Sequence, residues 1–238
     1  MYDLFNRSLD SAAHAQALRD RGLVTISNFL PPATADRLHQ HLQQDVAWDL
    51  AYSEQGRGRL LKAAQLAAMT PAQIRQAVDS AFREDEGDFR FIYNTMRVVE
   101  SWQQREFAQH PLYDFAEAVH QPEYLDFLRT LTGHANIERL SVMAARYLPG
   151  HFLTPHDDDD THEGREVTWI LNLTRDWRAE WGGLLHLMDD EGREITQSFV
   201  PAFNTMILFK PPRWHFVSQV ANFARQPRYT LTGWMLSR

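Results

Sequence analysis

The chain of 238 residues contains no cysteine. Disulfides, thiolate nucleophiles and cysteine-ligated metal sites are therefore excluded, and nothing in the composition indicates secretion. No apolar run approaches the roughly 18 residues that a membrane-spanning helix needs. The first residues also lack the long apolar core of a signal peptide. These absences predict a cytoplasmic protein, in reducing surroundings, that has no membrane partner.

An excess of basic residues is missing too. The formal net charge is −7, from 31 acidic and 24 basic residues, which argues against a nucleic-acid partner and against non-specific binding to anionic membranes. Apolar residues make up 44% of the chain and charged residues 23%, as is usual for a globular protein that buries a core. The length fits one domain, and no repeat or linker divides it. Nothing in the composition indicates an oligomeric state.

The first half of the chain, residues 1–134, has the pattern of helices that support a sheet. Only two strands are expected there, at 23–29 and 89–99, where apolar residues alternate with polar ones. A polar, glycine-containing stretch at 53–59 predicts a loop. The helices expected from apolar spacing and from proline and glycine ends are 11–21, 32–46, 60–68, 71–83, 107–120 and 122–131.

The second half, residues 135–238, changes to short β-type runs separated by Gly, Pro and Asp turns. Such runs are typical of a sandwich or a jelly roll. The expected strands are 138–147, 166–173, 184–188, 198–199, 204–209, 215–220 and 229–236. We therefore predict an α+β fold of one domain, 1–238, with a jelly-roll catalytic core at 135–238 and packed N-terminal helices.

Four residues of the second half carry chemistry by their type and order. His156 and Asp158 form a His-x-Asp pair, His215 opens a later alternating run, and Arg228 begins an apolar strand. Two imidazoles and one carboxylate make the facial triad of non-heme Fe(II) sites, which leaves three metal positions open. An arginine soon after the second histidine suits a planar, bidentate clamp on a carboxylate.

The acidic run that follows His156 offers more than one ligand. Side chains two residues apart on a strand share a face, which favours Asp158 over Asp157 as the partner of His156. The alternative interpretation of the whole run, 157–160, is a solvated or Ca²⁺-attracting acidic loop.

Two other arginines compete for the clamp. They are Arg213 and Arg225, and a surface ion pair is the ordinary alternative role for any arginine. Arg228 alone lies inside an apolar strand, and a buried guanidinium needs an anionic partner because an unpaired buried charge is costly.

Aromatic residues and glycines accompany these four residues in a fixed order. The accompanying stretches are Tyr147-x-x-Gly150-x-x-Leu153-x-x-His156-x-Asp158, Trp181-Gly182-Gly183, His215-x-Val217 and Arg228-x-Thr230-x-x-Gly233-Trp234. This ordered set resembles the 2-oxoglutarate/Fe(II)-dependent oxygenases of the prolyl-hydroxylase type. The resemblance covers roughly residues 135–238, and residues 23–30 are similar to the opening strand of that family.

The resemblance implies a double-stranded β-helix (jelly-roll, cupin-like) and an enzyme, a non-heme iron dioxygenase that hydroxylates an unactivated C–H bond. Its implied cofactor is Fe(II), its cosubstrates are 2-oxoglutarate and O₂, and ascorbate is a further reductant that it suggests. The implied metal ligands are His156, Asp158 and His215. The residues implied for 2-oxoglutarate are Tyr147, Leu153, Arg228 and Thr230, with a further residue near Leu171 along its methylene chain. For the two leucines, plain core packing is the alternative.

The resemblance favours a prolyl residue in a protein or peptide as the substrate. A free amino acid or small metabolite is the alternative within the same chemistry, and a cupin-like protein that binds a metal and a 2-oxo acid without oxygenase activity is the alternative outside it. The strand at 89–99 is the candidate surface for the substrate. Phe91, Tyr93 and Arg97 alternate on one face of that strand and could hold an extended peptide, although core packing of the two aromatic rings is the alternative.

Overall fold

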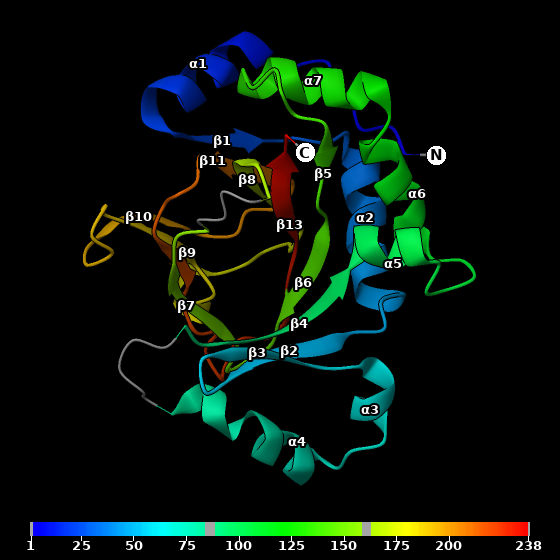
Figure 1. Ribbon diagram of the computed structural model, residues 1–238, viewed down its shortest axis with the longest axis vertical. Helices are drawn as coiled ribbons and strands as arrows, with labels where there is room; N and C mark the ends of the chain where they lie inside the picture. The colour runs from blue at the N-terminus through cyan, green and yellow to red at the C-terminus, as the bar shows by residue number, and fades with distance from the viewer. Residues whose placement is uncertain (1, 84–88, 159–162, 238) are drawn as a thin grey trace.

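A computed structural model describes residues 2–83, 89–158 and 163–237. Its strands form one curled antiparallel sheet, with helices along one side and at both ends (Figure 1). The helices are α1 (Ser11–Arg21), α2 (Pro32–Gln44), α3 (Ala63–Ala67), α4 (Pro71–Val78), α5 (Val98–Gln104), α6 (Pro111–Val119) and α7 (Pro122–Thr132). Among these helices, none combines the length and the apolar character that a membrane crossing requires.

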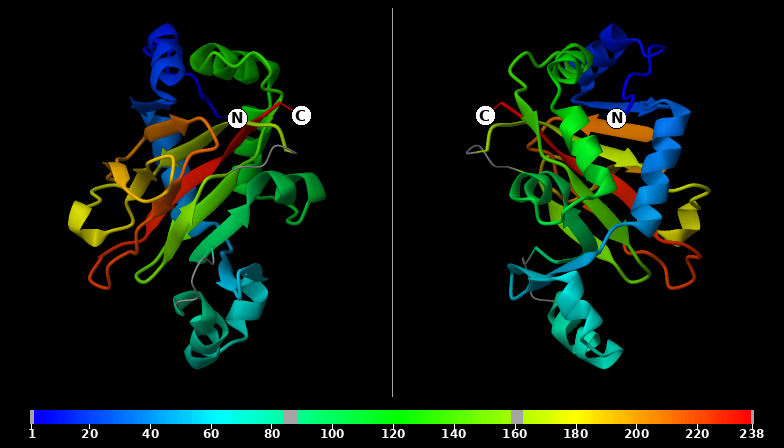
Figure 2. Two further views of the ribbon diagram at one scale, coloured as in Figure 1. Left: turned by 60° about the vertical axis from the view of Figure 1, so that its left-hand side comes forward. Right: turned by 90° about the vertical axis from the view of Figure 1, so that its right-hand side faces the viewer.

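The strands follow one hydrogen-bonded path, β1-β11-β8-β13-β6-β4-β7-β12-β9-β10, from which β2, β3 and β5 branch. Their bounds are β1 (Leu23–Ser27), β2 (Asp49–Glu54), β3 (Arg57–Leu61), β4 (Phe91–Arg97), β5 (Arg139–Leu140), β6 (Met143–Tyr147), β7 (Phe152–His156), β8 (Arg165–Asn172), β9 (Leu185–Met188), β10 (Ile195–Phe199), β11 (Thr205–Phe209), β12 (His215–Val217) and β13 (Arg228–Leu236). The longest strand, β13, lies between β6 and β8 and is the red ribbon of Figure 2. The path passes from this arm through β4 to a second arm of β7, β12, β9 and β10.

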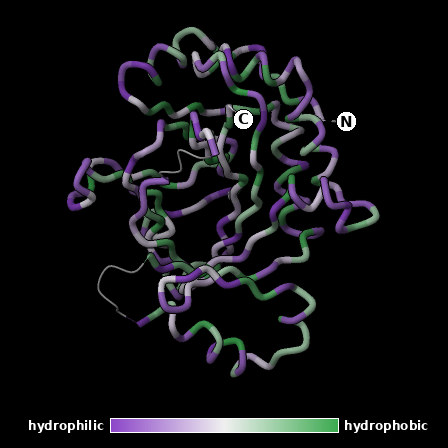
Figure 3. Tube along the Cα trace, viewed as in Figure 1, coloured by the Kyte–Doolittle hydropathy of each residue, from purple (hydrophilic) through white to green (hydrophobic). Residues whose placement is uncertain are grey.

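The helices pack as their sequence predicts. Asp10 caps α1 by accepting a hydrogen bond from the Ala13 amide at 3.0 Å, and Gly22 ends the helix in the left-handed conformation. In α2, Leu38 and Leu42 recur at helical spacing and are fully buried against the sheet. Figure 3 shows hydrophobic and hydrophilic residues alternating along the helices at the edge of the molecule. The main core lies between these helices and the arm of β8, β13 and β6.

The predicted loop at 53–59 is wrong, because the chain forms a hairpin there. β2 and β3 pair in register around a two-residue turn at Gln55 and Gly56, whose φ angles are 51° and 70°. Positive φ at both central residues is the turn that suits a hairpin, but Gln-Gly is a weaker signal for it than Asn-Gly or Asp-Gly. Most of β3 is exposed, so its residues show no alternation that would predict a strand. The predicted helix 60–68 shortens to α3 as a result.

The first half therefore contributes four strands rather than the two that the sequence predicts. Two of the four, β1 and β4, were expected. β1 pairs with β11, and β4 pairs with β6 and β7. β4 thus joins the two arms of the sheet, and it brings the first half of the chain to the space between them.

Candidate active site

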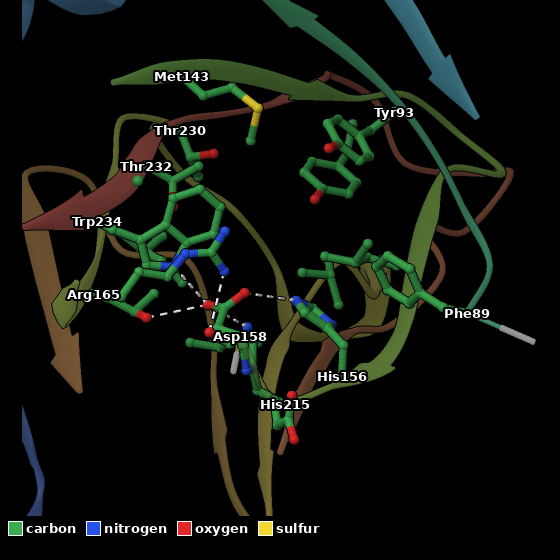
Figure 4. Close-up of a pocket in the computed structure, with 18 of the residues that line it drawn as sticks. Phe89, Tyr93, Met143, His156, Asp158, Arg165, His215, Thr230, Thr232 and Trp234 are labelled. Carbon is green, nitrogen blue, oxygen red and sulfur yellow. Dashed lines mark hydrogen bonds and ion pairs between the residues drawn. The ribbon is translucent and has the colours of Figure 1, made fainter. Parts of the chain in front are cut away.

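A cavity of about 390 Å³ lies between the two arms of the sheet (Figure 4). One wall comes from β6, β8 and β13, and the other from β7, β9 and β12. Its lining residues include His156, Asp158, His215, Arg228, Tyr147, Thr230 and Leu153, which are the seven site residues that the sequence predicts. The fold therefore brings these seven residues together in one place.

Two histidines and one aspartate meet at the base of this cavity. His156 ends β7 and His215 begins β12, and the two residues are register partners in neighbouring strands. The Asp158 carboxylate lies between them, with Oδ1 at 3.5 Å from His156 Nε2 and Oδ2 at 3.6 Å from His215 Nε2. One ligand atom from each of the three residues lies within 4.8 Å of the others, close enough to bind one cation.

Backbone carbonyls orient the two imidazoles. His156 Nδ1 lies 3.0 Å from the Thr154 carbonyl, and His215 Nδ1 lies 2.8 Å from the Arg213 carbonyl. A carbonyl only accepts, so each Nδ1 carries the proton and each Nε2 has its lone pair free for a metal. Burial and the neighbouring His156 lower the pKa of His215, which keeps that ring in the neutral, metal-binding form.

Asp158 reaches its place by a turn and not by strand geometry. β7 ends at His156, and Asp158 has a positive φ of 60°. Its Oδ2 accepts hydrogen bonds from Thr168 Oγ1 and Trp234 Nε1, each at 3.1 Å. Asp157 also lines the cavity, but its carboxylate is not part of the three-residue cluster. The last two residues of the acidic run, Asp159 and Asp160, lie outside the described part of the chain.

Arg228 lies buried on β13 with only 2% of its surface exposed. Neither Nε nor Nη1 has a hydrogen-bond partner among the described residues. Burial lowers the pKa of Arg228 to about 10, so the side chain is still charged at neutral pH. The guanidinium lies 5.2 Å from the ring centre of Tyr147, its register partner on β6. A buried cation without an anionic partner predicts an anionic ligand in this part of the cavity.

Three other groups of this wall face the same ligand space. Thr230 is buried two residues beyond Arg228 on β13, on the same face of the strand. Burial raises the pKa of Tyr147 above its usual range, so its hydroxyl keeps its proton and can donate. Leu153 lines the cavity as expected, while Ile170 lines it in place of Leu171, which belongs to the core on the other side of β8.

The strand expected to face the substrate does so only in part. Tyr93 lines the cavity and stacks on Tyr147, with ring centres 5.5 Å apart. Phe91 packs between Tyr93 and Phe89, and the Phe89 ring lies 4.9 Å from that of His156 at the cavity mouth. Arg97 lies outside this cavity, because it is exposed at the far end of β4.

Several residues that line the cavity, Leu185 among them, belong to no motif that the sequence shows. Thr168, Met143, Thr232 and Arg165 line the cavity without belonging to any motif, and Trp234 was noticed only as a companion of Gly233. Met143 and Tyr93 lie across the cavity from Asp158 in Figure 4. Strand periodicity could have identified Thr232 and Trp234 as lining residues. They alternate on one strand with Arg228 and Thr230, so all four side chains share a face.

The chemistry of the cavity follows from these parts. Two neutral imidazoles and a carboxylate suit a divalent transition metal with open positions. Arg228 is buried on the same wall as Thr230, and two of its nitrogens have no partner among the residues that the structure describes, so it suits a carboxylate that reaches in from the metal side. The residues present therefore fit both an iron ion and a dicarboxylic 2-oxo acid.

The second half of the chain matches a described family. Residues 142–236 match the 2OG-Fe(II) oxygenase superfamily. The chain is also 27% identical over 156 residues to a mouse (Mus musculus) protein named prolyl 3-hydroxylase OGFOD1. That alignment covers 62% of this chain but 28% of the mouse protein, so the chain spans less than a third of its relative.

Several solved structures share the fold. A prolyl-4-hydroxylase from Pseudomonas putida superposes with a TM-score of 0.56 at 19% identity, covering 96% of this chain and 99% of that one. An oxidoreductase of the 2OG-Fe(II) oxygenase family from Burkholderia pseudomallei gives 0.64 at 14% identity, over 100% and 94%. A prolyl hydroxylase from Trichoplax adhaerens, in complex with a peptide fragment of hypoxia inducible factor, gives 0.57 at 19%, over 95% and 89%. These likenesses confirm the predicted double-stranded β-helix.

Proposed function

We propose that the chain is a 2-oxoglutarate- and Fe(II)-dependent dioxygenase that hydroxylates a prolyl residue in a protein or peptide. The match of residues 142–236 to the 2OG-Fe(II) oxygenase superfamily supports this proposal. One observation carries the proposal. A cluster of two imidazoles and a carboxylate shares a cavity with the buried guanidinium of Arg228, whose Nε and Nη1 have no partner in the described part of the chain. A metal cupin that bound no carboxylate ligand would gain nothing from a buried arginine that is costly to desolvate.

In this proposal His156, Asp158 and His215 hold the iron. Bound Fe(II) supplies the redox chemistry that converts 2-oxoglutarate and O₂ to succinate and CO₂ and places one oxygen atom on a substrate carbon. The residues of the chain hold the metal and the cosubstrate in place. The carbonyls of Thr154 and Arg213 orient the two imidazoles so that both Nε2 atoms would face the metal. Three protein ligands would leave coordination positions of the metal open for the cosubstrate and O₂.

Arg228 binds the remote carboxylate of 2-oxoglutarate through Nε and Nη1, which have no other partner among the described residues. Thr230 and Tyr147 donate hydroxyl hydrogens to the same carboxylate, and Leu153 packs along the methylene chain. Because the Arg228 side chain is buried, its guanidinium and the carboxylate each offset the cost of removing the other from water. Binding the far end of the molecule fixes where its 2-oxo end lies.

The relatives support a prolyl substrate in a protein or peptide. The mouse relative is named a prolyl 3-hydroxylase, and two of the similar structures are prolyl hydroxylases, one of them with a bound peptide. At the cavity mouth Phe89 is 39% exposed and close to His156, so a ring presented by an extended peptide would meet an aromatic wall.

We also propose an accessory reductant, a cellular location and a single-domain organisation. Ascorbate serves as an accessory reductant, which an activity that rises on its addition would support. The cytoplasm is the location, because reducing surroundings keep iron as Fe(II). Residues 1–238 act as one domain, because β1 and β4 hydrogen-bond to strands of the second half, and removal of residues 1–134 should leave no folded core.

Succinate release tests the proposal. Protein loaded with Fe(II) and 2-oxoglutarate should release succinate in step with the gain of one oxygen atom by a proline-containing peptide. His215→Ala should release none. If a free amino acid is oxidised and no peptide is, the substrate class is wrong while the oxygenase chemistry stands. If neither iron nor 2-oxoglutarate binds, the whole proposal is wrong.

A further inference from the structure

The two oxygens of the Asp158 carboxylate have unequal surroundings. Oδ2 accepts one hydrogen bond from Thr168 Oγ1 and one from Trp234 Nε1, both at 3.1 Å. Each carboxylate oxygen has two lone-pair sites, so these two donors occupy the accepting capacity of Oδ2. Each oxygen also faces one imidazole, with Oδ1 at 3.5 Å from His156 Nε2 and Oδ2 at 3.6 Å from His215 Nε2. Only Oδ1 has no hydrogen-bond donor among the described residues. Oδ1 is therefore the oxygen that is free for a metal.

The two donors come from facing positions of neighbouring strands. Trp234 on β13 is the register partner of Thr168 on β8, so their side chains project from the same face of the sheet. Figure 4 shows the Trp234 indole and the Asp158 carboxylate meeting beside the two histidines. Because both donors stand on paired strands, the register of these strands directs two hydrogen atoms to one oxygen.

Arg165 fixes the same unit from a third direction. Its guanidinium lies 3.7 Å from the ring centre of Trp234, and Nη1 donates to the backbone carbonyl of Asp158 at 3.1 Å. The Trp234 amide is held in turn by Ser141 Oγ at 2.8 Å. Asp158 needs such anchoring because its φ of 60° is unfavourable for a residue with a side chain and persists only where the surroundings enforce it.

We propose that Trp234 and Thr168 are positioning residues that make Asp158 bind the metal through Oδ1 alone. This inference rests on the proposed function, since it concerns the metal of that site. A six-coordinate metal with three protein ligand atoms keeps three positions open, which a 2-oxo acid and O₂ need. If Asp158 bound through both oxygens, one of those positions would be lost. The donors to Oδ2 would thus keep a coordination position of the metal available for the cosubstrate.

Trp234→Phe and Thr168→Val test this inference on metal-loaded protein without O₂. Phenylalanine keeps an aromatic ring beneath Arg165 but removes the indole N–H together with the rest of the five-membered ring. Valine is close in shape to threonine, so Thr168→Val is the cleaner removal of a donor. Co(II) replaces Fe(II), because its visible spectrum reports the number of ligands. Each variant should still bind Co(II), should show a changed Co(II) spectrum, and should bind 2-oxoglutarate about ten-fold to a hundred-fold more weakly. The double variant should show the larger loss.

The control is Trp102→Phe, which makes the same change on α5, where the indole stacks on His120 away from the cavity. If the substitutions only loosen the site in general, the result should be reversed. The affinity for Co(II) should then fall, and the Co(II)-loaded variants should bind 2-oxoglutarate as the wild type does. That result, or an unchanged spectrum in both variants, overturns the inference. Wild-type protein that binds no Co(II), or whose Co(II) form binds no 2-oxoglutarate, overturns the proposed function instead. If Trp234→Phe does not fold, Thr168→Val decides the question from the other strand.

Discussion

Replacing Arg228 by methionine tests whether its buried charge is there for an anionic ligand. The side chain is 2% exposed, and two of its nitrogens have no partner among the described residues. Burial lowers its pKa from 12.5 to about 10, which corresponds to about 3 kcal/mol by which the fold disfavours the charged form. At pH 7 the guanidinium is charged in both the folded and the unfolded chain. The fold without ligand therefore carries this cost in full.

Two opposite effects should follow from Arg228→Met. Without ligand, the free energy of unfolding should rise by about 1–3 kcal/mol, because an apolar side chain of similar length replaces a buried charge that lacks an anionic partner among the described residues. With metal and 2-oxoglutarate, the wild type should gain stability and the variant should gain little. A hydrogen bond to a charged group contributes roughly 1.5–3 kcal/mol, so the affinity for 2-oxoglutarate should fall about ten-fold to over a hundred-fold. Metal binding should survive, because Arg228 is not part of the metal cluster.

Urea unfolding without O₂, in Co(II), with and without 2-oxoglutarate, measures both effects on the same samples. Arg225→Met is the matched control, since Arg225 is exposed three residues earlier and should respond in neither condition. A variant that is less stable than the wild type without ligand, and that 2-oxoglutarate stabilises equally well, would refute the reasoning. Loss of binding in Arg225→Met or Arg213→Met instead would move the clamp to that residue.

Three further expectations concern the metal and the pH response. His215→Ala should abolish the weak visible charge-transfer band of protein with Fe(II) and 2-oxoglutarate under anaerobic conditions, because it removes one of three anchors. Asp158→Ala should abolish the same band and Asp157→Ala should spare it, and the reverse outcome would reassign the ligand. Burial lowers the pKa of His151 from 6.5 to about 4, so the unfolded chain takes up a proton more readily as the pH falls between these values. The free energy of unfolding should therefore decrease by up to about 3 kcal/mol from pH 6.5 to pH 4, and unfolding of His151→Gln followed over that range should show a flatter profile.

The residues of the cavity that bind the metal and the anion can be predicted from the sequence, because few residue types can fill these roles. A metal that must keep open positions restricts the ligands to imidazoles and a carboxylate, and a buried arginine restricts the ligand to an anion. His156, His215 and Arg228 could therefore be found by type, spacing and surroundings, and the structure brings them into one cavity. The strand periodicity of the second half likewise predicts β8, β11 and β13 to within a few residues.

What the sequence could not show is pairing between distant segments. Thr168 carries no local mark that distinguishes it from any threonine in a buried strand. Its role depends on facing Trp234 across β8 and β13 and on the turn that brings Asp158 to both of them. The β2–β3 hairpin was missed for a different reason, since an exposed strand has no buried face to impose alternation on its residues.

Asp158 shows how a sequence rule can select a residue for a reason that the structure does not contain. The rule that alternate side chains share a face requires strand geometry from His156 through Asp158, but β7 ends at His156 and Asp158 has a φ of 60°. The carboxylate lies between the imidazoles because Arg165, Thr168 and Trp234 hold its backbone and one of its oxygens. These anchors follow Asp158 in the chain and belong to the opposite arm of the sheet. The position of the third metal ligand is thus set by the closure of the two arms, and a fault in that closure should disturb the metal site before it disturbs either strand.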